Sequence, residues 1–136
     1  MNIPPGAVVY VPSAQFTLIA PAGFRLLAAI ERAARALGYN VTITSACDGT
    51  HSGANDPHHR GCAYDVRTHN LVDEQKTVLL QTIVDDCRDA DEGPSVPLST
   101  LAHSLASRRF FGFVEDFGTA NEHIHVQLRQ GRTYPV

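Results

Sequence analysis

The sequence predicts an α+β fold in which helices pack on a mostly antiparallel sheet. Two segments have the three- and four-residue apolar spacing of amphipathic helices, and several short β-branched or aromatic runs have the pattern of strands. The order is helix, strand, strand, helix and then a late hairpin, which favours α+β over a regularly alternating parallel sheet. A chain of 136 residues fits one domain, residues 1–136.

The first half of the chain contains the clearest helix. Apolar residues recur at helical spacing from Pro21 to Leu37, and Gly38 follows where a C-cap glycine is expected. Before this helix, Pro-punctuated apolar runs indicate short strands or extended segments at 8–12 and 16–21. After it, the β-branched run 39–46 predicts a strand, and the composition of 47–61 predicts a loop.

The second half begins with a strand at 62–68. Its alternation places Ala63, Asp65 and Arg67 on one face and Cys62, Tyr64 and Val66 on the other. The remaining elements are predicted from apolar period and turn composition: an amphipathic helix at 72–90, a loop at 91–97, a shorter helix at 98–108, and strands at 110–117 and 123–128 joined by a turn at 118–121.

Charge and hydropathy exclude several classes of partner. The net charge is −3, and the eleven Lys and Arg residues form no run longer than the pair Arg108 and Arg109, so the sequence gives no footprint for nucleic acid or an anionic membrane. No run approaches the roughly 20 apolar residues of a membrane span, and the N-terminus lacks the pattern of a secretory signal. We expect a monomer that is made and folded in a cytoplasm.

The cysteines do not indicate a thiol metal site. Cys47, Cys62 and Cys87 contain no Cys-x-x-Cys spacing, and three cysteines cannot all pair with one another. A bridge between Cys47 and Cys62 is geometrically conceivable, but buried free thiols are the favoured interpretation.

Histidines and an aspartate gather in two distant stretches, "HHRGCAYDVR" at 58–67 and "NEHIHVQL" at 121–128. Catalytic zinc takes three protein ligands from His, Asp and Glu and keeps one position for water. His58 ends the loop and Asp65 lies inside the next strand, with Gly61 between them allowing a tight turn. His123 and His125 leave the same face of a strand, so one or both can reach a metal held by the first pair.

A metal-activated water also needs a carboxylate that accepts its proton. Glu122 is the candidate general base, provided that residue 122 still belongs to the turn and the strand begins at His123 or later. Glu115, on the far side of the turn, is its main competitor, and Asp116 is a weaker one.

These residues carry a resemblance. His58-x-x-Gly61-x-Ala63-x-Asp65 followed by Glu122-x-x-His125 resembles the signature of the zinc D-alanyl-D-alanine carboxypeptidase superfamily. That superfamily includes carboxypeptidases, dipeptidases and phage L-alanyl-D-glutamate endolysins, and the hedgehog signal domain shares its fold. The stretch "TSACDGTHSG" also resembles a branch common among phage proteins, and the resemblance covers about residues 20 to 130.

The resemblance implies that His58, Asp65 and His125 bind Zn²⁺ and that Glu122 is the general base. It further implies a metallopeptidase that hydrolyses an amide bond in peptidoglycan stem peptides, acting on the cell wall after phage-type release or from a virion. Two positions depart from the family pattern: Asp56 replaces the usual Ser, and Asp48 stands near the usual substrate-holding Arg. His51 or Arg60 is the candidate for the missing substrate donor. Ser45 and His123 are further candidate substrate contacts; the alternative for Ser45 is that it fixes the loop by hydrogen bonding, and for His123 that it fills the sheet face beside the metal.

Two other functions stay open. A binding or structural module, for instance a phage virion component, could keep the fold and the metal without cutting. A zinc hydrolase acting on an amide outside the cell wall is the weaker alternative. An acidic residue at 122 favours the enzyme, because a purely structural zinc prefers a fourth protein ligand to an open position.

Overall fold

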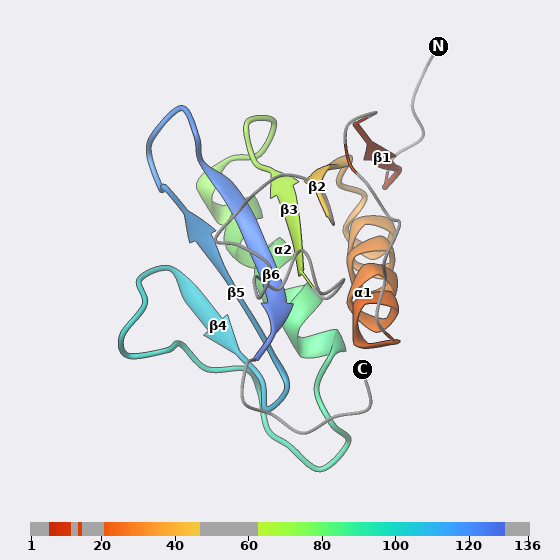
Figure 1. Ribbon diagram of the computed structural model, residues 1–136, viewed down its shortest axis with the longest axis vertical. Helices are drawn as coiled ribbons and strands as arrows, with labels where there is room; N and C mark the ends of the chain where they lie inside the picture. The colour runs from red at the N-terminus through yellow and green to blue at the C-terminus, as the bar shows by residue number, and fades with distance from the viewer. Residues whose placement is uncertain (1–5, 12–13, 15–20, 47–62, 130–136) are drawn as a thin grey trace.

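The computed structural model describes residues 6–11, 14, 21–46 and 63–129. In these residues, two helices pack on a six-stranded mixed sheet of order β1-β2-β3-β6-β5-β4, in which only the β1–β2 pair is parallel (Figure 1). The predicted α+β class with a mostly antiparallel sheet is confirmed. The elements are β1 (Val8–Tyr10), α1 (Pro21–Leu37), β2 (Val41–Ser45), β3 (Ala63–Arg67), α2 (Asp73–Asp86), β4 (Ser104–Ala106), β5 (Phe110–Glu115) and β6 (His123–Leu128).

Helix α1 has the predicted bounds, and its ends show why. Pro21 occupies the first helical position, where its missing N–H costs nothing, and Gly38 adopts φ +70° just after the last turn. The buried stripe follows the predicted spacing and includes Leu26 and Ile30. The Tyr64 hydroxyl on β3 donates to the carbonyl of Gly23, 2.9 Å away, so the helix is also tied to the sheet by a buried hydrogen bond.

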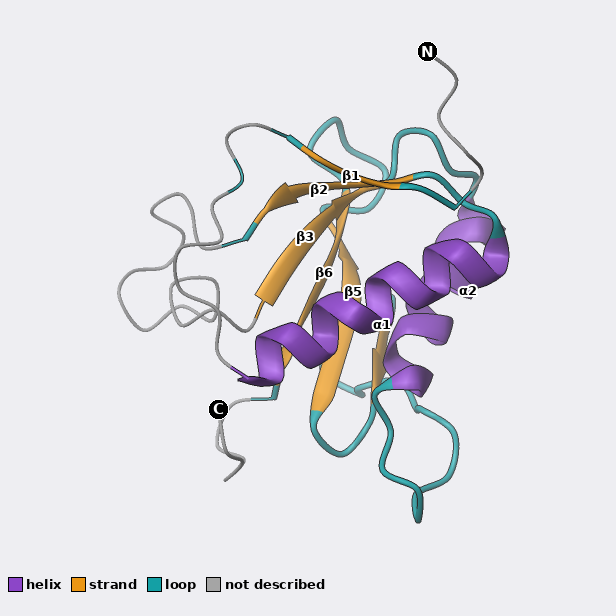
Figure 2. Cartoon of the chain, turned by 90° about the vertical axis from the view of Figure 1, so that its right-hand side faces the viewer, coloured by secondary structure: helices purple, strands orange, loops and turns teal. Residues whose placement is uncertain are grey.

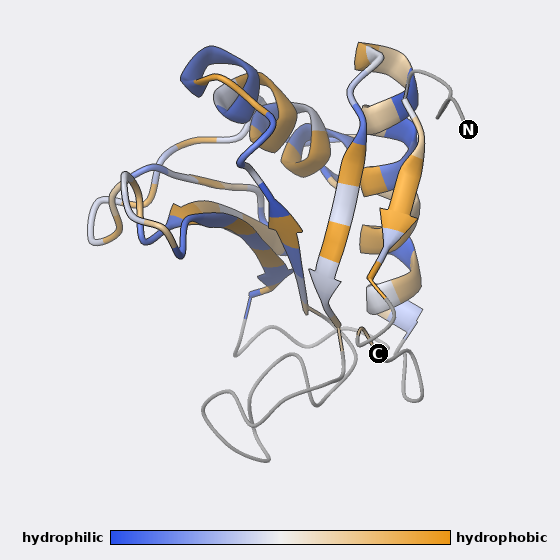
Figure 3. Ribbon diagram, turned by 90° about the horizontal axis from the view of Figure 1, so that it is seen from above, coloured by the Kyte–Doolittle hydropathy of each residue, from blue (hydrophilic) through white to orange (hydrophobic). Residues whose placement is uncertain are grey.

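Both helices cover the same face of the sheet (Figure 2). The strands alternate apolar and polar residues, as Figure 3 shows, and the fully buried Tyr64, Val66, Ile124 and Val126 face the helices. Asp65, as predicted, lies on the opposite face of β3 from Tyr64 and Val66. The face away from the helices therefore carries the polar residues of the two central strands.

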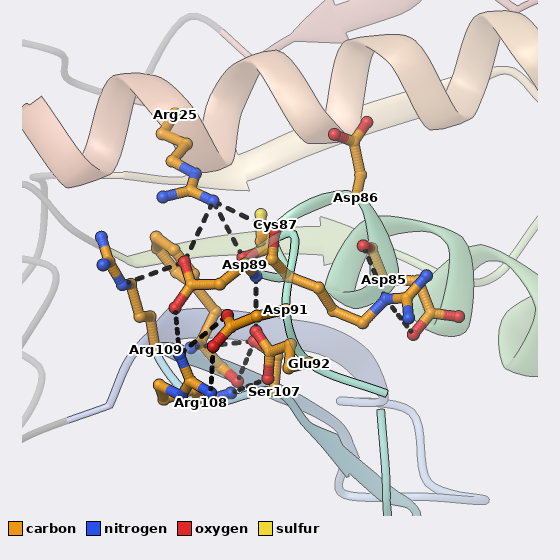
Figure 4. A network of polar contacts seen from close by, with 12 residues as sticks. Arg25, Asp85, Asp86, Cys87, Asp89, Asp91, Glu92, Ser107, Arg108 and Arg109 are labelled. Atoms are coloured by element: carbon orange, nitrogen blue, oxygen red, sulfur yellow. Dashed lines mark hydrogen bonds and ion pairs between the residues drawn. The ribbon is translucent and has the colours of Figure 1, made fainter. Parts of the chain in front are cut away.

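Helix α2 ends earlier than predicted, at Asp86 instead of residue 90. Arg25 of α1 donates to the carbonyls of Cys87 and Arg88, and the Asp89 amide donates to the Glu92 carboxylate. The Asp89 amide thus has a side-chain acceptor in place of the carbonyl four residues earlier that a longer helix would have supplied. Figure 4 shows the resulting network, in which Asp89 also pairs with Arg108 and Arg109 from the segment between β4 and β5.

The helix predicted at 98–108 is wrong: this segment is a pair of turns followed by strand β4. The buried Ser104 hydroxyl accepts from the Leu98 amide at 2.9 Å and donates to the Leu101 carbonyl at 2.6 Å. His103 has a φ of +55°, which no α-helix contains. Residues 104–106 pair with strand β5 as β4, and this tertiary pairing overrides the helix that the three-residue apolar spacing predicts.

Ser104→Ala should lower the free energy of unfolding by about 1–2 kcal/mol, because two buried backbone groups lose their partner. Urea denaturation measures the change. Ser99→Ala, in the exposed turn of the same segment, is the matched control. Equal stability of the two variants would contradict this account of the turn.

The other sequence predictions have mixed outcomes. Cys87 is a buried free thiol as predicted, and burial raises its pKa to about 12, so it is protonated at neutral pH. Cys47, Cys62, most of the predicted segment 16–21 and the predicted loop 47–61 lie outside the described residues. In the described ranges, neither helix has the length and apolar character needed to cross a membrane.

Candidate metal centre

The antiparallel pairing of β3 with β6 brings two predicted metal ligands together. Asp65 is opposite His125 in the register, and its Oδ1 lies 3.0 Å from His125 Nδ1. The two side chains are 14% and 10% exposed, so the pair is largely shielded from water. Because the pair lies on two central strands of the sheet, backbone hydrogen bonds on both sides hold its position.

A β-bulge in β2 adjoins this pair. Ile43 pairs with Val66 and Ser45 with Asp65, so Thr44 is an extra residue on β2. The Thr44 hydroxyl donates to the Asp65 carbonyl at 3.5 Å. Ser45, a predicted substrate contact, is thereby positioned opposite Asp65 at the end of its strand.

The second ring nitrogen of His125 is also held. His125 Nε2 lies 2.7 Å from Gln127 Oε1, and the Phe113 ring packs 5.4 Å from the imidazole, centroid to centroid. Burial acts to lower the pKa of His125, but the hydrogen bonds with Asp65 and Gln127 outweigh it, and the pKa is raised overall. Both hydrogen bonds therefore favour the protonated form of the ring.

His123 lies beside the pair and has contacts of its own. Its Nδ1 is 2.8 Å from the carbonyl oxygen of Asn121, which accepts only if Nδ1 carries the proton. Its Nε2 is 3.6 Å from Asp65 Oδ1 and 3.5 Å from Glu115 Oε1. Glu115, the competing base, is thus on the same face of the sheet as the Asp65–His125 pair.

Glu122 meets the predicted condition on the backbone, because β6 begins at His123. Its carboxylate is buried and bound on several sides: Lys76 Nζ lies 2.6 Å from Oε1, the Thr68 hydroxyl donates at 2.7 Å, and the Gly118 amide donates at 3.0 Å. Burial acts to raise the pKa of Glu122, but these three donors lower it to about 2. Glu122 is therefore ionised at neutral pH and is also a weak proton acceptor in this arrangement.

Acid should remove the stabilisation that Glu122 provides. Its pKa is about 2 in the folded chain against 4.5 for an ordinary glutamate, so its contribution is complete above pH 4.5 and is lost as the pH falls toward 2. The difference in unfolding free energy between the native protein and Glu122→Gln should shrink over this range, as measured by urea denaturation at successive pH values. A difference that does not change with pH would contradict the assignment.

A pocket of about 220 Å³ opens beside these groups. Its lining includes Asp65, Glu122 and His123, together with Thr44, Arg67, His69, Ala120 and Asn121. Arg67, which the sequence indicates only as a solvated strand charge, is exposed at this pocket. The predicted base, one predicted ligand and one predicted substrate contact thus border one cavity.

Asp65 and His125 fit two of the three positions of a zinc site. Ligand atoms about 2.0–2.2 Å from one tetrahedral zinc lie roughly 3.3–3.6 Å apart, and Asp65 Oδ1 and His125 Nδ1, at 3.0 Å, would have to separate by a few tenths of an ångström. No group of three or more His, Cys, Asp or Glu arranged for a metal occurs in residues 6–11, 14, 21–46 and 63–129. The third predicted ligand, His58, lies outside these ranges, as do His51 and Arg60.

Two residues of this region were missed by sequence reasoning. Gln127 follows His125 by two positions on the same strand, and this spacing places both side chains on one face. This two-residue spacing is visible in the sequence and could have identified Gln127. Lys76 lies on α2, 46 residues from Glu122 in the chain, and only the packing of α2 on the sheet brings the two together.

Comparisons with known proteins add no family to this description: no protein-family model, curated protein or solved structure matches the chain.

Proposed function

We propose that this protein is a zinc-dependent peptidase that hydrolyses an amide bond in peptidoglycan stem peptides. The observation that carries the proposal is the convergence of Asp65 Oδ1 and His125 Nδ1 from two separate segments of the chain. The order and spacing of His58, Asp65, Glu122 and His125 support it through their resemblance to the zinc D-alanyl-D-alanine carboxypeptidases. The α+β arrangement is compatible with the hedgehog-like fold of that superfamily.

Asp65 and His125 would hold the metal together with His58. Zinc, when bound, would supply Lewis acidity toward the amide carbonyl and make a neighbouring water more acidic. A peptide that enters the pocket lined by His123 and Arg67 would place its carbonyl beside the Asp65–His125 pair.

The proton path needs one carboxylate, and we assign it to Glu122. This residue would accept a proton from the attacking water and deliver it to the leaving amine, so that a C–O bond replaces the C–N bond. For this role Glu122 must exchange its contact with Lys76 for one with the water, because a carboxylate with a pKa of about 2 is a weak base. Glu115 is the alternative, since it already lies beside His123 on the same face.

The test combines metal analysis with digestion of purified peptidoglycan. We expect about one zinc ion per chain in the native protein, in Glu122→Gln and in Glu115→Gln. Native protein should release peptides identifiable by mass, and Glu122→Gln should cut about 10²- to 10⁴-fold more slowly. Glu74→Gln, on the exposed side of α2, is the surface control.

Two results would revise the proposal in different ways. Loss of cleavage in Glu115→Gln but not in Glu122→Gln would move the base to Glu115. Zinc in the native protein without any cleavage would eliminate the peptidase.

A binding or structural module of the same fold is the second candidate. The buried ion pair of Glu122 with Lys76 favours it, because a carboxylate held in this way stabilises the turn before β6 without taking part in chemistry. Zinc binding with no hydrolysis of peptidoglycan or of simpler amides is the expected result for this candidate.

A further inference from the structure

We propose that a pocket between α2 and the turns beside β4 and β5 binds a small phenolic molecule. The pocket has a volume of about 380 Å³ and is bordered by α2, by the segment that leads into β4 and by the end of β5. Cavities of this size hold small organic ligands, and most such sites combine apolar walls with a few polar groups. Val114 pairs with Ile124 on the face of the sheet that the helices cover, so this pocket does not open beside Asp65 and His125. Binding here needs neither the metal nor peptidase activity.

Apolar side chains form much of the lining of this pocket. Leu80 of α2 and Val114 of β5 are buried, and the half-buried Leu105 of β4 lies with them at the pocket. His103 and Phe117 add two stacked rings, whose centroids lie 4.1 Å apart with 18° between their planes. Aromatic rings pack favourably against aliphatic and aromatic side chains of this kind, so an aromatic ligand suits the lining.

The backbone holds the two stacked rings in an unusual conformation. His103 has a φ of +55° and Asp116, next to Phe117, has a φ of +52°, and these are the two non-glycine residues with positive φ in the described part of the chain. The Val114 amide donates to the His103 carbonyl at 3.1 Å and so ties the two turns together. Left-handed backbone at non-glycine residues is concentrated at functional sites, ligand clamps among them. The strained turns therefore mark this pocket as a candidate binding site.

The polar groups of the pocket favour a neutral ligand that both donates and accepts a hydrogen bond. Lys76 Nζ lies 3.0 Å from Asp73 Oδ1, which also borders the pocket, and 2.6 Å from Glu122 Oε1. Within the described residues, these contacts use two of the three N–H donors of Lys76 and leave one for a ligand. A ligand carboxylate would meet the negative charges of Asp73 and Glu122, and a ligand amine would meet the positive charge of Lys76. A phenol hydroxyl can accept from Lys76 and donate to Asp73.

Titrations of the full chain, followed through its backbone amide resonances, test the site. The probe is p-cresol, which should shift the amides of Leu105, Val114 and Phe117. Toluene has the same ring and methyl group without the hydroxyl, and it should bind about 3- to 10-fold more weakly because it cannot bond to Asp73 and Lys76. The charged comparators 4-methylbenzoate and 4-methylbenzylamine should also bind more weakly than p-cresol.

Two pairs of variants locate the site. Phe117→Ala removes one ring of the lining and should weaken p-cresol binding about 3- to 10-fold, whereas Phe24→Ala, which removes an exposed phenylalanine of α1, should leave it unchanged. Asp73→Ala should reduce the advantage of p-cresol over toluene, and Glu74→Ala, its neighbour in the first turn of α2, is the matched control. Urea denaturation checks that each variant is folded, and if Phe117→Ala does not fold, the Asp73 and Glu74 variants decide.

Any of three results would eliminate the phenol site. They are p-cresol that shifts no amide of the pocket, toluene or a charged comparator that binds as tightly as p-cresol, and control variants that lose as much affinity as Phe117→Ala and Asp73→Ala. None of these results bears on zinc binding or on the cleavage of peptidoglycan, which metal analysis and digestion test separately.

Discussion

Lys76→Met is expected to lower the free energy of unfolding by about 3–5 kcal/mol. The side chains of Lys76 and Glu122 are only 11% and 6% exposed, and methionine would leave the Glu122 carboxylate buried without a counter-charge. Thr68 and the Gly118 amide would still donate to it, but neither carries a charge. Urea denaturation at neutral pH measures the loss.

Two further variants make this prediction specific. Lys76→Met combined with Glu122→Gln should recover much of the lost stability, because no buried charge is then unpaired. Arg32→Met is the control: Arg32 meets Asp86 through two hydrogen bonds of 2.8 Å, but its side chain is 55% exposed. This exposed pair should contribute less than about 1 kcal/mol. Equal losses in Lys76→Met and Arg32→Met would show that burial does not set the strength of the pair.

Gly112→Ala is expected to cost about 1–3 kcal/mol through overpacking. A Cβ atom at residue 112 would lie 2.6 Å from Leu80 Cδ1, 2.7 Å from Val126 Cγ1 and 2.9 Å from the backbone oxygen of His125. The two side chains can shift, but the carbonyl belongs to the strand that carries the candidate metal ligand. The alanine should therefore also change the backbone chemical shifts around His125.

Gly93→Ala is the control for this substitution, because nothing lies within 4 Å of a Cβ atom at residue 93. We expect its stability to stay within about 0.5 kcal/mol of native. Thermal or urea denaturation distinguishes the two alanine variants. If Gly112→Ala were as stable as Gly93→Ala, α2 and β6 would have to accommodate the methyl group without strain.

The parts of the fold that sequence predicted well are those with several agreeing local signals. Helix α1 combines an apolar period with Pro21 at its start and Gly38 after its end, and both ends are correct. Strand β6 alternates strictly and has its predicted bounds. Segment 98–108 had only an apolar spacing as a helix signal. Its structure is determined instead by the hydrogen bonds of the Ser104 hydroxyl and by the pairing of β4 with β5.

In the candidate site, too, some contacts follow from local sequence pattern and others depend on tertiary packing. Alternation along β3 and β6 was sufficient to place Asp65, His123 and His125 on one face, and the register then made Asp65 and His125 neighbours. The partner of Glu122 could not be predicted, because its contact with Lys76 depends on how α2 packs on the sheet. Local pattern therefore predicts which residues share a face, while tertiary packing decides which charges meet.

The five-residue pairing of β3 with β6 has a consequence for how the chain reaches its native state. If β3 paired with β6 one residue out of register, its side chains would exchange faces. Asp65 and Arg67 would then point into the apolar layer, and Tyr64 and Val66 would point to solvent. Such chains would lose both their hydrophobic contacts and the contact between Asp65 and His125, the two candidate metal ligands. The same register of β3 with β6 therefore buries Tyr64 and Val66 in the core and brings Asp65 beside His125.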